Sequence, residues 1–215
     1  MTIRLPMFPL GSVLLPHAPL SLHIFEPRYR VLMFDCLRGE PTFGVVLIER
    51  GQEVGGGDMR FAVGTRSRIV EAEELADGRW IILAVGMDRI RVMSWLPDDP
   101  YPLAEVDELG EEPWSRPAEE ARILAEASVV RSLSLAAELL GRMEGGTGTA
   151  AMSPPQLALA GDPLVASWQL VAAAPLASLD RQHLLELDDH AERLRQLRRM
   201  SDEQATMFAH RLGNE

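Results

Sequence analysis

The chain has 215 residues, of which 47% are hydrophobic and 25% charged, a composition that suits one large globular domain or two small ones. Its net charge of −11 disfavours binding to phosphate backbones and to anionic lipid surfaces. The chain contains no lysine, which excludes Walker-type phosphate loops, kinase active sites, Ser–Lys dyads and Schiff-base chemistry.

No apolar run approaches the ~20 residues that a membrane helix needs, and Pro6, Pro9 and Pro16 interrupt any N-terminal leader. We therefore expect a cytoplasmic protein without membrane contact. The single cysteine, Cys36, lies among apolar neighbours, which predicts a buried and inert thiol.

The composition changes near residue 113, from Val, Ile, Phe, Gly and turn pairs to Ala, Leu, Glu and Arg. This shift predicts a β subdomain at residues 1–113 and a helical subdomain at 114–215. The fold class expected is α+β.

In the first part, Pro27 suits the start of a helix and Gly39 its end. Asp77-Gly78 predicts a hairpin turn, and a second turn is expected around Asp88. Strands are predicted at residues 43–49, on each side of Gly64 within 60–75, and at 80–85, 89–95 and 103–109. Many short strands with turns between them suggest a closed or nearly closed barrel.

In the second part, Pro117 opens a predicted helix that runs to about Met143. Its apolar stripe is expected to consist of Ile123, Ala127, Val130, Ala137 and Leu140. A flexible loop is predicted at residues 144–155, where Gly and Thr are frequent.

Further helices are expected between Pro163 and Pro175, at residues 178–187, and after a cap at Asp188 or Asp189. Ser201 and Gln204 fit a capping box, which predicts a separate final turn or helix up to residue 213.

No set of residues assembles into a catalytic or metal-binding pattern. The sequence lacks HExxH and GxSxG motifs, and the five histidines do not converge with other ligands at metal-site spacing. We predict a protein that is not an enzyme, with no catalytic residues, no metal and no cofactor.

Several short motifs, taken in order, point to a family. Residues 5–10 read LPMFPL, residues 13–16 read VLLP, and residues 20–29 read LSLHIFEPRY. The pattern continues at residues 43–47, 63–65, 77–79, 85–86, 89–92, 100–102, 104–106, 179–182 and 184–186. Together they resemble the LON substrate-binding domain, the N-terminal region of ATP-dependent Lon proteases, over almost the whole chain.

The resemblance implies a PUA-like β-pseudobarrel with one inserted helix, followed by a C-terminal helical bundle. It also implies a non-catalytic module that binds exposed apolar segments of unfolded or client proteins. With no lysine, the chain looks like the substrate-binding part without ATPase and protease domains, so a separate ATPase or protease is a further expected partner. The oligomeric state, the client and the binding surface are left open.

The candidate partner-binding residues are Phe25, Glu26, Arg28, Tyr29 and Trp95. Glu26 is expected to accept backbone N–H bonds at the helix start, and Arg28 to pair with it or with a neighbouring acid. For Glu26, Arg28 and Tyr29 a folding role is the first expectation. Trp95 is expected on the same strand face as Arg89 and Arg91.

The alternative function is RNA binding through the PUA-like barrel. It rests on a barrel face that Arg66, Arg68, Arg89 and Arg91 could share, and the net negative charge argues against it. The densest basic cluster in the sequence consists of Arg193, Arg195, Arg198 and Arg199, and acidic residues surround it.

Overall fold

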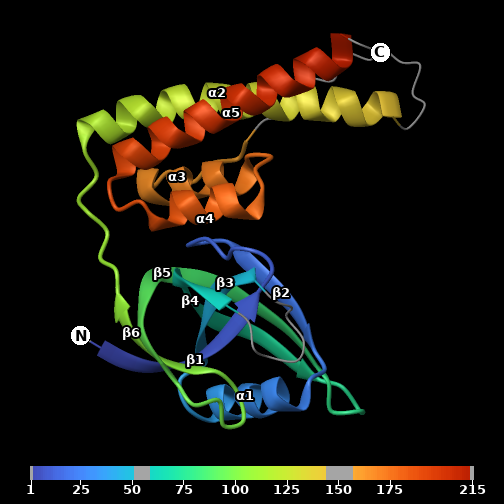
Figure 1. Cartoon of the computed structure of the whole chain (residues 1–215), viewed down its shortest axis with the longest axis vertical. Coiled ribbons are helices and arrows are strands. Elements are labelled where there is room, and N and C mark those ends of the chain that lie inside the picture. Colours follow the sequence, from blue (N-terminus) through green and yellow to red (C-terminus); the bar gives the residue numbers. More distant parts are fainter. Residues whose placement is uncertain (1, 51–58, 144–156, 214–215) are drawn as a thin grey trace. The chain divides into compact units, whose positions relative to one another are not determined.

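The structure is a computed structural model, and it describes residues 2–50, 59–143 and 157–213. The chain divides into two compact units, Met1–Glu111 and Glu112–Glu215. Among the described residues, the first unit has six strands and one helix and the second has four helices; Figure 1 labels them. The protein therefore mixes α and β structure, as predicted.

A single sheet forms the first unit. Its strands are β1 (Thr2–Leu10), β2 (Pro19–Ile24), β3 (Thr42–Arg50), β4 (Met59–Glu74), β5 (Trp80–Leu96) and β6 (Leu103–Glu108). The strand order is β2-β5-β4-β3-β1-β6, and β6 also pairs with β5. Five strands thus follow one another in a closed circuit of pairings, and β2 joins it through β5.

Strands β4 and β5 form one long hairpin around the predicted Asp77-Gly78 turn, where Gly78 has a φ of 77°. The predicted interruptions at Gly64 and Asp88 are wrong, because both residues lie inside continuous strands. At Gly64 the glycine permits close packing on β3. Near Asp88 the pairing register shifts between Thr65 and Ser67, so the chain forms a bulge rather than a turn.

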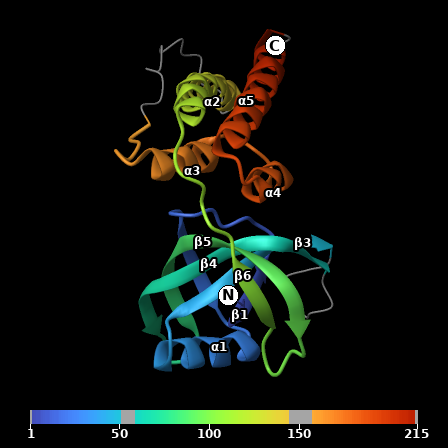
Figure 2. The same cartoon turned by 90° about the vertical axis from the view of Figure 1, so that its left-hand side faces the viewer.

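Helix α1 (Pro27–Arg38) lies across one end of the strands (Figures 1 and 2). It begins at Pro27 and is capped at Gly39, as the sequence predicts. Its buried residues are Tyr29, Leu32, Met33 and Cys36. They join a core cluster with residues of the first strands, among them Phe8, Ile24 and Phe43. Burial of this side anchors the helix, since so short a helix is unstable alone.

The second unit consists of α2 (Arg116–Met143), α3 (Pro163–Ala173), α4 (Ser178–Glu186) and α5 (His190–Gly213). Helices α2 and α5 run side by side over most of their length (Figures 1 and 2). The predicted loop at 144–155 lies outside the described residues.

The predicted apolar stripe of α2 is wrong, because Ile123 and Leu140 are among the exposed residues. The buried face instead carries mainly small residues, which are Ala118, Ala121, Ala125, Ser128 and Ser132, together with Val129 and Leu139. Small side chains let two helix axes approach closely, so burial here follows side-chain size rather than hydrophobicity.

Helix α5 begins as predicted, with the Asp189 carboxylate accepting a hydrogen bond from the Glu192 backbone N–H at 2.7 Å. No new helix starts at Ser201, so that prediction is wrong. Leu194, Leu197, Ser201 and Ala205 are all buried at helical spacing, and α5 continues through them without a break.

Candidate functional site

Helix α1 has two distinct faces. One is buried in the core, whereas the other leaves Val31, Phe34 and Leu37 exposed by 41%, 53% and 41%. Phe25, just before the helix, is 56% exposed. Successive spacings of three residues place Val31, Phe34 and Leu37 on neighbouring positions of the helix surface. A contiguous apolar surface of this kind is typical of an interaction site.

A pocket of about 280 Å³ lies between this face and the end of the β4–β5 hairpin. Its lining residues are Pro27, Arg30, Val31, Phe34, Glu74 and Trp80. Most of the lining is apolar, and the two charges, Arg30 and Glu74, come from different elements. The Arg30 guanidinium lies against Gly78, where a Cβ atom would be only 2.8 Å from Arg30 Cζ. The hairpin turn therefore holds Arg30 beside the pocket.

The structure separates the sequence-predicted residues around α1. Glu26 caps the helix with its backbone but makes no side-chain cap, and its carboxylate instead accepts a bond from Arg28 Nε at 3.1 Å. Tyr29 is 2% exposed, and its ring stacks on Phe8 with a centroid distance of 4.0 Å. Tyr29 is therefore a core residue, while Phe25 remains on the surface. Sequence reasoning missed Val31, Phe34 and Trp80 as a group, although the helical spacing of Val31 and Phe34 was visible.

Trp95 lies elsewhere on the sheet, and its predicted face is wrong. The β5–β6 register shifts between Val92 and Ser94, so Trp95 pairs with Ala104 and shares the face of Val92 rather than that of Arg91. Its ring is 36% exposed, and Arg60 Cζ lies 4.3 Å from the ring centroid. Trp95 is not among the residues that line the α1 pocket.

The arginines of the sheet do not form the shared face that RNA binding would need. Arg89 is fully buried and forms an ion pair with Glu111 at 2.9 Å. Arg66 is paired with two carboxylates, those of Asp88 at 2.7 Å and Glu108 at 2.6 Å. The expectation of a common surface for Arg66 and Arg89 is therefore wrong.

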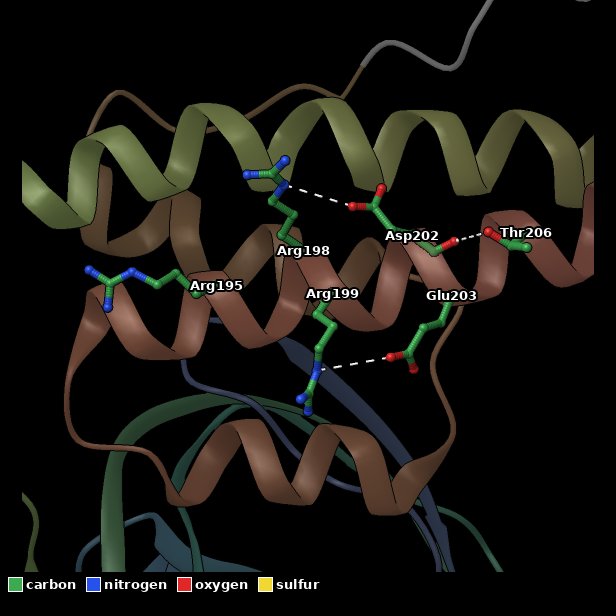
Figure 3. Close-up of a pocket in the computed structure, with 6 residues that line it drawn as sticks. All are labelled: Arg195, Arg198, Arg199, Asp202, Glu203 and Thr206. Carbon is green, nitrogen blue, oxygen red and sulfur yellow. Dashed lines mark hydrogen bonds and ion pairs between the residues drawn. The ribbon is translucent and has the colours of Figure 1, made fainter.

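The basic cluster of α5 is also neutralised. A groove of about 420 Å³ there is lined by Arg195, Arg198, Arg199, Asp202, Glu203 and Thr206. Arg198 and Arg199 lie 3.8 and 4.0 Å from Asp202 and Glu203, and they point to opposite sides of the helix (Figure 3). Arg193, the fourth member, is buried with its guanidinium 3.8 Å from the centroid of Trp168. This surface carries mixed charge rather than a positive field.

The Cys36 thiol lies on the core side of α1 and is buried. Burial, together with the nearby Asp35 carboxylate, raises the pKa of the Cys36 thiol to about 12. In the part of the chain that the structure describes, no three His, Cys, Asp or Glu side chains gather as metal ligands. None of the described helices is long and apolar enough to span a membrane.

Comparison with known proteins gives a consistent family signal. Residues 4–201 match the family described as the ATP-dependent protease La (LON) substrate-binding domain. A Lon protease 2 of Herpetosiphon aurantiacus is 28% identical over 202 residues, which cover 91% of this chain and 23% of that protein. A LON peptidase N-terminal domain and RING finger protein of Schizosaccharomyces pombe is 27% identical over 115 residues, 48% of this chain and 24% of that protein. The chain thus spans about a quarter or less of the length of these relatives.

Two solved structures share the architecture. A Lon N-terminal domain protein from Xanthomonas campestris is 30% identical, with a TM-score of 0.61 and coverage of 91% of this chain and 96% of that one. The N-terminal domain of a Mycobacterium avium complex Lon protease superposes with a TM-score of 0.59 over 95% of this chain and 98% of that one. At 17% identity, the second structure supports the fold alone.

Proposed function

Because the chain belongs to the LON substrate-binding domain family, we propose that it recognises client proteins through their exposed apolar segments. The matched family is a substrate-binding domain, and the proposed role is binding rather than catalysis. In this role the protein would present captured clients to an ATPase or protease partner.

The observation that supports this proposal best is the exposed face of α1 with its adjoining pocket. Phe34 and Val31 are exposed to solvent on one face of α1, whereas the other face of this helix is packed in the core. The pocket volume of about 280 Å³ is at the lower limit for small-molecule sites. It suits one or two side chains of a peptide, and its largely apolar lining favours apolar ones.

We also propose the finer organisation implied by the family. The sheet unit, residues 1–113, would be a PUA-like pseudobarrel, and residues 114–215 a helical bundle. The closed circuit of strand pairings supports the first part of this description.

The experiment measures binding to a permanently unfolded client, fluorescein-labelled β-casein, by fluorescence anisotropy. Phe34 exposes 53% of its surface, roughly 100 Å² of apolar area for a phenylalanine side chain. Covering that area contributes about 2.5 kcal/mol before the costs of association are subtracted. We therefore expect Phe34→Ser to weaken binding by about tenfold or more.

Ile123→Ser on α2 is the matched control, since Ile123 is 56% exposed and lies outside the α1 surface. It should remove a similar exposed apolar group without changing the affinity. Equal affinities for the wild type and both variants would contradict the proposed site, and no binding of casein by the wild type would contradict the proposed function.

A further inference from the structure

Strand β2 has an open edge. Each of the other five described strands pairs with at least two neighbours, whereas β2 pairs with β5 alone. An open edge presents backbone donors and acceptors that another extended chain can use.

The pairing register identifies the outward-facing groups. Just before β2, the Ala18 carbonyl accepts a hydrogen bond from the Gly86 N–H at 2.9 Å, so it points toward β5, while the Ala18 N–H donates to the Leu15 carbonyl. Successive carbonyls of a strand point to opposite sides, so the hydrogen-bonded pairs within β2 are Leu20–Ala84 and Leu22–Ile82. Pro19, Ser21 and His23 therefore direct their backbone groups away from β5. Pro19 fits this assignment because it has no N–H to contribute.

The three residues whose backbone groups point outward lie at the surface. Pro19, Ser21 and His23 are exposed residues, and outside the pairings of the sheet no hydrogen bond to Ser21 or His23 is present among the described residues. Strand edges are commonly protected by charged side chains, yet the β2 sequence PLSLHI contains no lysine, arginine or acid. Protection is limited to Pro19 at one end.

The side chains beside this edge favour an apolar strand. Leu20 and Leu22 are only partly buried and pack against the core cluster that contains Ile24 and Tyr29. A strand added along β2 would place alternate side chains next to Leu20 and Leu22 and complete their burial.

The edge also leads to the α1 pocket. Strand β2 ends at Ile24, which pairs with Trp80, and Trp80 lines the pocket together with Pro27. Because Trp80 lies on β5, across β2 from the open edge, a chain bound along β2 would reach the pocket by passing over the end of β2 at Ile24.

We propose that β2 receives an extended segment of an unfolded client as an added strand. The client backbone bonds to Ser21 and His23, and a neighbouring apolar side chain enters the α1 pocket. This inference rests on the proposed function, and it defines the preferred client as an extended segment with apolar residues at alternate positions.

A client segment suits this edge better than a second copy of the chain does. In a two-fold antiparallel pairing of β2 with itself about Ser21, Pro19 of each copy faces His23 of the other. Each end of that ladder then lacks one N–H donor, because each copy contributes a Pro19. When a client strand binds instead, only one Pro19 is present and only one donor is missing.

The test uses a fluorescein-labelled synthetic decapeptide with valine at alternate positions and one terminal phenylalanine. Ser21→Pro removes an outward N–H that β5 does not use, and its ring obstructs an approaching strand. Loss of a backbone hydrogen bond together with this obstruction is expected to weaken binding by about tenfold. Ser21→Ala keeps the N–H and is the matched control, with unchanged affinity expected.

Hydrogen exchange of the wild type, followed by NMR, gives a readout that does not depend on the folding of the proline variant. The peptide should slow exchange at the Ser21 and His23 amides, while the Leu20 and Leu22 amides are already protected by β5. Unchanged exchange at Ser21 and His23 at saturating peptide would overturn the strand-addition proposal.

The outcomes separate the two proposals. If Ser21→Pro binds like Ser21→Ala while Phe34→Ser loses binding, client recognition at α1 stands and strand addition is wrong. If Ser21→Pro abolishes a wild-type dimer without changing peptide affinity, the occupant is a second copy and the client proposal for β2 is wrong.

Discussion

Replacing Gly64 by alanine is expected to destabilise the sheet strongly, because β3 passes too close for a side chain. A Cβ atom at Gly64 would overlap the Val45 carbonyl oxygen and would lie 2.7 Å from Val46 Cγ1 and 3.1 Å from Val45 C. The obstacle is largely backbone in a hydrogen-bonded strand, so relief requires the β3–β4 pairing itself to shift.

Two other glycines provide a scale. At Gly44 a Cβ would meet Met7 Cε at 2.8 Å and Ile90 Cδ1 at 2.9 Å, which are ends of flexible side chains. At Gly110 no atom lies within 4 Å. Overpacking costs about 1–3 kcal/mol, so we expect a loss of about 3 kcal/mol for Gly64→Ala and about 1 kcal/mol for Gly44→Ala. Gly110→Ala should stay within about 0.5 kcal/mol of the wild type.

The assay is urea unfolding followed by circular dichroism, with thermal unfolding as a second readout. At about 2–4 °C per kcal/mol for a chain of this size, Gly64→Ala should lower Tm by roughly 6–12 °C. The close approach of β3 and β4 would be refuted if the free energy of unfolding of Gly64→Ala lay within 1 kcal/mol of that of Gly110→Ala, with the same m-value.

Two further predictions concern groups around Asp35. Burial, and then the hydrogen bond that its hydroxyl donates to Asp35, raises the pKa of Tyr101 from 10.0 to about 12. The protonated Tyr101 hydroxyl therefore contributes its full stabilisation below pH 10, and this contribution is lost as the pH rises through 12. In urea unfolding between pH 9 and 12, the free energy of unfolding of Tyr101→Phe should lack this loss. Parallel pH dependences of the wild type and Tyr101→Phe would contradict the prediction. The pKa of about 12 for Cys36 predicts that Ellman's reagent at pH 8 modifies the thiol of the native protein far more slowly than the thiol of the urea-unfolded protein. Equal rates of modification would show that Cys36 is not held in the core.

Local signals in the sequence account for much of the fold. Pro27 with Gly39, Asp77-Gly78 and the Asp189 cap each fix a backbone conformation or satisfy a backbone group within a few residues. Such features can be predicted from the sequence because each residue acts on the backbone conformation of its own immediate neighbours. The family motifs are similarly local, and the match over residues 4–201 confirms the family they indicate.

Predictions failed where burial depends on a distant partner. Helical spacing alone predicts an α2 stripe of Ile123, Ala127, Val130, Ala137 and Leu140, yet the buried face consists mainly of alanine and serine. Ser201 has the sequence of a cap, but α5 stays packed through it. The face of Trp95 was reversed by a bulge that appears only in the pairing of β5 with β6.

By itself, the sequence determined the class of structure and the family, because these depend on composition and on short motifs. The tertiary structure decided which of the motif residues reach the surface. Within helix α1 it buried Tyr29 and exposed Phe34. Among the described strands it paired β2 with β5 alone. Both outcomes depend on which strands close around the core, and that closure is made by contacts between residues far apart in the chain.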